Sequence, residues 1–153
     1  LFRSTTEQLT DELLSEDENK YHAFLILDVD CFKQINDIYG HAVGDIVLQK
    51  FGKLLKGTFR EGDILGRIGG DEFGVIMKNI QTKDIAMKKA EELLAKTQAY
   101  KIDELKGNNI SISIGISTAP QDGDCYMDLY KRADQALYQA KRSGKARVCN
   151  YFS

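Results

Sequence analysis

The seven residues from Arg67 to Phe73, which read Arg-Ile-Gly-Gly-Asp-Glu-Phe, constrain the fold more than any other stretch of the chain. Short apolar segments flank them at 64–68 and 73–77. Two glycines between such segments predict a tight turn, because glycine adopts backbone angles that other residues disfavour. The sequence therefore predicts a β-hairpin with Asp71 and Glu72 at its tip, where phosphates and metal ions could approach the backbone. An ordinary hairpin with a solvated acidic tip is the alternative.

Hydrophobic periodicity predicts the elements around this hairpin. The apolar run 23–27 predicts a buried strand that ends in Asp28. Isoleucines that alternate with serine and glycine over 110–117 predict a half-buried strand. The remaining elements are helices over 2–14, 43–56, 84–99 and 126–140 and a closing edge strand over 148–152. The inner order, β-α-β-β-α-β, predicts an α+β sandwich of the ferredoxin-like kind with a mostly antiparallel sheet.

Length, charge and cysteine content limit the classes of function. The 153 residues suit one domain with a substantial core. The net charge of −2 provides no basic field for a nucleic-acid partner, and no apolar run is long enough for a membrane span. Cys31, Cys125 and Cys149 are too widely spaced to indicate a metal-ligand pair, and their odd number argues against a disulfide framework. These features predict a cytoplasmic domain with reduced cysteines.

Carboxylates at the predicted strand end and hairpin tip could bind a divalent cation. Asp28 and Asp30 lie two residues apart, so both side chains project the same way if the chain is extended. Asp28 and Asp71, on adjacent strands, would supply the hard oxygen ligands that Mg²⁺ or Mn²⁺ prefers. The alternative is a pair of strand-terminal aspartates that cap a loop.

Three further motifs accompany the glycine-rich hairpin in a fixed order. The four are Asp28–Asp37 with Gly40-His41 and Gly44-Asp45, then Gly69–Phe73, then Ser111–Ile116, then Ala133–Lys141 with Gly144-Lys145. Together they resemble the motifs of the GGDEF family, the diguanylate cyclases, over about Tyr21 to Asn150. The resemblance implies a palm fold related to class III nucleotidyl cyclases. It also implies that two GTP molecules are condensed into cyclic di-GMP.

The resemblance implies roles for single residues. It places Mg²⁺ or Mn²⁺ on Asp28, the Val29 carbonyl and Asp71. Either Asp71 or Glu72 would relay the proton of the ribose 3′-hydroxyl, and Lys33 would neutralise charge on the transferring phosphate. The other implied substrate-binding residues are Phe32, Asn36, His41, Asp45, Gly69, Gly70, Lys141 and Lys145.

Within this set, Asn36 and Asp45 would read guanine, because a carboxylate accepts from guanine N–H groups that adenine lacks. The segment 32–45 is expected to be a loop and a helix start whose N–H groups follow the phosphates. Lys145 stands where the family has arginine, which keeps the charge but loses bidentate geometry. A solvated Lys33, a structural His41 and a helix-start Asp45 are the alternatives.

Arg60 and Asp63 form an Arg-x-x-Asp pattern before the hairpin. The resemblance implies an inhibitory site there for cyclic di-GMP, with a surface ion pair as the alternative. A second arginine often completes such a site, but the region of helix 84–99 offers only lysines for that role, namely Lys83, Lys88, Lys89 and Lys96.

The implied active unit is a homodimer in which each domain holds one GTP. The family's usual Asp-x-Leu-Thr-Gly-Leu opening is absent, so we expect 1–153 to be one excised domain whose upstream regulatory domain is missing here. A catalytically silent module that senses GTP or cyclic di-GMP is the rival hypothesis. The presence of Asp28, Asp71 and Glu72 favours the enzyme, and Asp45 disfavours a purine-relaxed cyclase.

Overall fold

The computed structural model describes residues 7, 8, 11 and 21–151 and is built around a five-stranded sheet of order β2-β3-β1-β6-β7. The strands are β1 (Tyr21–Val29), β2 (Ile64–Gly69), β3 (Glu72–Ile80), β6 (Ile112–Ala119) and β7 (Val148–Asn150). All neighbours pair antiparallel except β6 and β7. The predicted α+β class, the β-α-β-β-α-β order and the mostly antiparallel sheet are confirmed.

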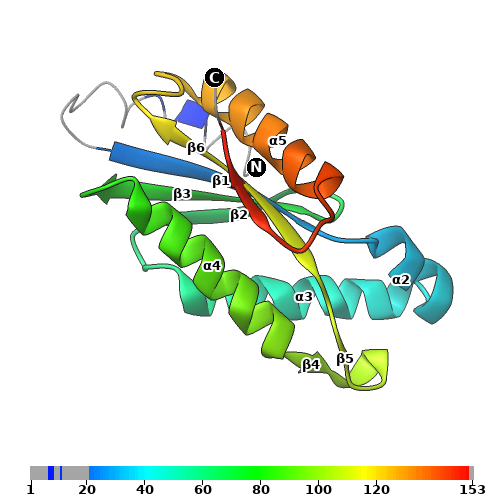
Figure 1. Cartoon of the computed structure of the whole chain (residues 1–153). Helices are drawn as coiled ribbons and strands as arrows, with labels where there is room; N and C mark the ends of the chain where they lie inside the picture. The colour runs from blue at the N-terminus through cyan, green and yellow to red at the C-terminus, as the bar shows by residue number, and fades with distance from the viewer. Residues whose placement is uncertain (1–6, 9–10, 12–20, 152–153) are drawn as a thin grey trace.

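Helices cover both faces of this sheet (Figure 1). Helices α3 (His41–Thr58) and α4 (Asp84–Ala99) lie on one face, and α5 (Tyr126–Arg142) lies on the other. Strand β1 alternates between them, because Leu25 and Leu27 belong to the core under α3 and α4 whereas Phe24 and Ile26 pack with residues of α5. Two residues further along β1, the same alternation places Asp28 on the α5 face.

The predicted helices agree with α3, α4 and α5 to within two residues at each end. The predicted helix over 2–14 falls mostly outside the described residues, of which 7, 8 and 11 are helical. The closing strand is shorter than predicted and ends at Asn150. No helix in the described part of the chain has the length and apolar character needed to cross a membrane.

Strand β6 corrects the prediction of a half-buried strand, because all eight of its residues are buried. Its isoleucines face the α3 and α4 core. Gly115 and Ser117, on the other face, lie under α5, and Ser113 donates to Asp30. A side-chain carbon on Gly115 would lie 2.2 Å from the carbonyl oxygen of Ala133. The small residues therefore mark a close helix contact rather than a solvated face.

The segment after β1 corrects a second prediction. Residues 32–39, expected to be a loop, form helix α2 (Phe32–Tyr39), and α3 begins at His41. Gly40, with φ of +92°, separates the two helices and donates its N–H to the Asn36 carbonyl at 2.8 Å. The chain also forms a small separate sheet of β4 (Lys101–Ile102) and β5 (Asn108–Asn109), joined by the 3-10 turn Asp103–Leu105.

Candidate active site at the end of strand β1

The predicted β2–β3 hairpin forms and lies against the end of β1. Gly70, with φ of +47°, and Asp71 make the turn, and Glu72 is the first residue of β3. Arg67 braces the turn by donating from Nε to the Gly70 carbonyl at 2.7 Å. The Val29 N–H points to the Asp71 carbonyl at 3.5 Å, and Asp28 stands directly opposite Glu72 in the sheet. Three carboxylates thus gather at this strand end.

Asp28 is the most perturbed acid of the cluster. Its carboxylate is buried, forms an ion pair through Oδ2 with Lys141 Nζ, and has no hydrogen-bond donor to Oδ1 among the described residues. Burial raises the pKa of Asp28 to about 7, with a further rise from the neighbouring Asp71 carboxylate and an opposing effect of Lys141. An unsatisfied buried oxygen among hard oxygen groups is the arrangement that a small divalent cation would satisfy.

Glu72 has a partner that the sequence motifs did not indicate. Tyr130 of α5 donates from its hydroxyl to Glu72 Oε1 at 3.0 Å. Burial and the Glu72 charge raise the pKa of Tyr130 to about 12, so the phenol stays a donor at neutral pH. Burial also raises the pKa of Glu72, and the Tyr130 hydrogen bond opposes that rise.

The neighbouring acid Asp30 lies in a different environment. It is buried and accepts hydrogen bonds from the hydroxyls of Ser111 and Ser113 and from the backbone N–H of Ala146. Asp28 and Asp30 therefore bond different partners, although they are only two positions apart.

The predicted guanine readers lie where α2 packs on α3. Oδ1 of Asn36 is buried without a donor among the described residues, and Asn36 and the Phe32 ring both lie against Gly44. A side-chain carbon on Gly44 would be 1.9 Å from Asn36 Oδ1. Asp45, the next residue, is exposed and lines a cavity of about 450 Å³ together with Leu48, Gln49, Arg67 and Phe73. The structure thus brings Asn36 and Asp45 to one region.

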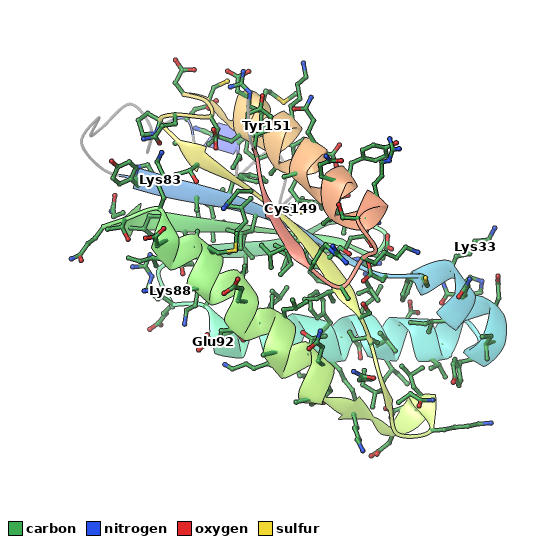
Figure 2. All side chains as sticks on the ribbon, viewed as in Figure 1. Lys33, Lys83, Lys88, Glu92, Cys149 and Tyr151 are labelled. Atoms are coloured by element: carbon green, nitrogen blue, oxygen red, sulfur yellow. The ribbon has the colours of Figure 1, made fainter. Side chains whose placement is uncertain are left out.

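The predicted basic residues of the site lie in different environments. Lys33 and His41 are exposed, and Lys33 projects from α2 into solvent (Figure 2). Lys141 lies among the carboxylates through its pair with Asp28. Lys145 is exposed, and its Nζ contacts Cys31 Sγ at 3.2 Å, which raises the pKa of Lys145.

Arg60 and Asp63 form more than a surface ion pair. Arg60 bonds Asp63 through its guanidinium at 2.8 Å and through its backbone N–H at 3.1 Å, and it also donates to the Lys78 carbonyl at 2.6 Å. The Asp63 side chain is fully buried, whereas that of Arg60 is 52% exposed. Arg60 is therefore the member of the pair that an incoming ligand could reach.

Among the lysines offered in place of a second arginine, Lys88 of α4 projects into solvent, as does Glu92 of the same helix (Figure 2).

Tyr130, Ser111 and Ser113 are the site residues that sequence reasoning missed. A helical stripe could have indicated Tyr130, because Tyr130, Asp134 and Lys141 recur at the spacing of one helix face. The charges of both residues affect the pKa of Glu72, which Asp134 raises and Lys141 lowers. No local pattern marks the serines as partners of Asp30.

The chain is similar to proteins of a known family. Residues 3–147 match the family described as "Diguanylate cyclase, GGDEF domain". The chain is 40% identical over 127 residues to diguanylate cyclase A of Treponema denticola, an alignment that covers 82% of this chain and 34% of that protein. The chain thus spans about a third of the length of that curated relative.

Solved structures show the same fold. The GGDEF domain of YfiN (TpbB) from Pseudomonas aeruginosa has a TM-score of 0.93 and 32% identity, covering 99% of this chain and 96% of that chain. The GGDEF domain of DgcB from Caulobacter crescentus, solved in complex with c-di-GMP, has a TM-score of 0.86 and 26% identity, covering 97% and 89%.

Proposed function

The chain belongs to the GGDEF family of diguanylate cyclases, and from this premise we propose that it condenses two GTP molecules into cyclic di-GMP and pyrophosphate. The observation that carries the proposal is the environment of Asp28, which is buried with an oxygen that lacks a donor among the described residues and stands opposite Glu72. A silent sensor module would have no need to keep these carboxylates together.

The residues at this strand end fit a divalent cation. Asp28, the Val29 carbonyl and Asp71 would hold Mg²⁺ or Mn²⁺, since all three offer oxygen. The cation, when bound, would neutralise charge on the α-phosphate and favour ionisation of the 3′-hydroxyl.

The other residues bind and orient the nucleotide. Asn36 and Asp45 read the guanine edge, in the region where α2 meets α3. Lys141 and Lys145 hold the triphosphate, and Lys33 neutralises charge on the transferring phosphate. Glu72 or Asp71 takes the proton from the 3′-hydroxyl, after which the oxygen attacks the α-phosphate of the second GTP and pyrophosphate leaves. The reciprocal attack by the 3′-oxygen of the second GTP closes the ring and releases a second pyrophosphate.

One domain cannot complete this reaction, because each domain holds one GTP. Two copies meet with their β1 ends facing each other. Activity per domain therefore rises with protein concentration. Cyclic di-GMP bound at the site of Arg60 and Asp63 clamps the domains in an unproductive arrangement and inhibits.

The test is product identification by mass spectrometry after a coiled-coil fusion of the chain is incubated with GTP and Mg²⁺. We expect cyclic di-GMP from the fusion and none from its Asp71→Asn variant. Binding of GTP or cyclic di-GMP without any turnover would favour the silent sensor. Undiminished turnover in Asp71→Asn would contradict the metal assignment.

A further inference from the structure

Asp30 is a buried carboxylate for which the proposed reaction has no role. It is only 6% exposed, and donors from two distant segments surround it. Ser111 Oγ donates to Oδ2 at 2.5 Å and Ser113 Oγ donates to Oδ1 at 2.6 Å. The backbone N–H of Ala146 donates to Oδ2 at 3.1 Å. Both oxygens are therefore engaged, in contrast to Oδ1 of Asp28.

The segment that donates from Ala146 has an unusual backbone. Gly144, Lys145 and Ala146 have φ of +119°, +63° and +51°, and left-handed angles are disfavoured for residues with a side-chain carbon. Such a run persists only where surrounding contacts fix it. The contacts here are the Asp30–Ala146 bond, the Lys145 N–H to the Ala140 carbonyl at 3.0 Å, and the Ile114 N–H to the Arg147 carbonyl at 2.9 Å.

This backbone places the Lys145 side chain beside the turn that follows β1. Its ammonium lies 3.2 Å from Cys31 Sγ, and Cys31 itself directly follows Asp30. Asp30 thus holds the turn that carries Lys145 and also belongs to the strand end that the ammonium faces. A carboxylate is a stronger acceptor for a backbone N–H than a neutral oxygen.

We infer that Asp30 is a positioning residue that fixes the 143–147 turn and thereby orients Lys145 toward the triphosphate of the bound nucleotide. Ser111 and Ser113 support this role of Asp30, because their hydroxyls hold its carboxylate in one orientation. The inference rests on the proposed function, in which Lys145 contacts the triphosphate.

The test is a double-mutant cycle of Asp30→Asn and Lys145→Ala, read by calorimetric affinity for Mg²⁺ with GTPαS and, separately, for guanosine. We expect Asp30→Asn to weaken GTPαS binding about tenfold, the scale of one lost hydrogen bond to a charged group. Guanosine affinity should stay unchanged. Asp30→Asn should add nothing in a chain that already carries Lys145→Ala.

Two controls sharpen the cycle. Asp122→Asn changes a carboxylate that likewise accepts a backbone N–H, from Thr118 at 2.7 Å, but in another loop, and it should leave both affinities intact. Amide exchange of Ala146 should quicken in Asp30→Asn and not in Asp122→Asn. If Asp30→Asn does not fold, Ser111→Ala removes one of the bonds to Oδ2 and should give a smaller loss of the same kind.

The possible results distinguish failure of the positioning role of Asp30 from failure of the proposed function. Unchanged GTPαS affinity in Asp30→Asn, an equal loss of guanosine affinity, or additive effects in the double variant would overturn the inference alone. If Ser111→Ala is the variant used, unchanged GTPαS affinity overturns the inference as well. A wild-type chain that binds no GTPαS would overturn the proposed function, and the inference with it.

Discussion

The hydroxyl of Tyr130 lies 3.0 Å from Oε1 of Glu72, and this bond joins helix α5 to the first residue of β3. It holds one oxygen of Glu72 in place. We expect Tyr130→Phe to lower turnover of the dimerised enzyme about fivefold, because one hydrogen bond is worth about 1 kcal/mol. GTP affinity should be unchanged.

The matched control is Tyr138→Phe on the same helix, since Tyr138 is 61% exposed. Steady-state kinetics of both variants make the measurement. Equal turnover in Tyr130→Phe and Tyr138→Phe would show that the Glu72 bond has no catalytic role.

The raised pKa of Asp28 predicts a pH dependence of stability in the metal-free protein. The native carboxyl keeps its proton up to about pH 7, whereas the carboxyl of the unfolded chain has its ordinary pKa of 3.8. Its stabilising contribution is therefore fully present below about pH 3.8, is lost progressively as the pH rises from there to about 7, and is absent above that. Each pKa unit corresponds to about 1.4 kcal/mol, so between pH 5 and 8 the loss is about 3 kcal/mol at most.

Urea unfolding at pH 5 and pH 8 in the presence of a chelator measures this loss. Asp28→Asn cannot ionise and is the reference, against which the wild type should lose stability at pH 8. A stability difference between the two proteins that does not change with pH would contradict the raised pKa.

Gly44 should determine how well guanine is read. A side-chain carbon there would lie 1.9 Å from Asn36 Oδ1 and 3.2 Å from the Phe32 ring. We expect Gly44→Ala to displace the Asn36 amide and weaken GTP binding about tenfold, the scale of about 1.4 kcal/mol. ATP binding should change little.

Gly57→Ala is the control in the same helix, because nothing lies within 4 Å of the added carbon. Calorimetry with GTP and ATP compares the two variants. Full GTP affinity in Gly44→Ala would mean that the Asn36 orientation does not matter for binding.

Arg60 should carry product inhibition, because its side chain is half exposed while Asp63 is enclosed. We expect Arg60→Ala to raise the inhibitory constant of cyclic di-GMP about tenfold, the loss expected for one charged contact. The initial rate should stay nearly intact. Lys56→Ala removes a nearby cation that lines the same 450 Å³ cavity as Arg60 and should remain inhibited. If Arg60→Ala is inhibited as strongly as the wild type, the Arg60–Asp63 pair has only a structural role.

Much of the fold follows from the sequence alone. The hairpin at 67–73, the helices α3, α4 and α5, and the β-α-β-β-α-β order were all predictable, because turn chemistry and apolar periodicity are local properties of the chain. The motif residues at the end of β1 were named for the same reason. Helix α2 was not, because it is only eight residues long and its apolar face, formed by Phe32, Ile35 and Tyr39, is only partly buried against the core.

Only the tertiary structure decided which partners these residues meet. Tyr130 lies 58 positions from Glu72, and Ser113 lies 83 positions from Asp30, so no local pattern connects them. The same is true of β6, where α5 covers the serine and glycine face that its alternation predicts to be polar. Periodicity tells which residues share a face, but the helix that packs there determines whether that face is solvated or buried.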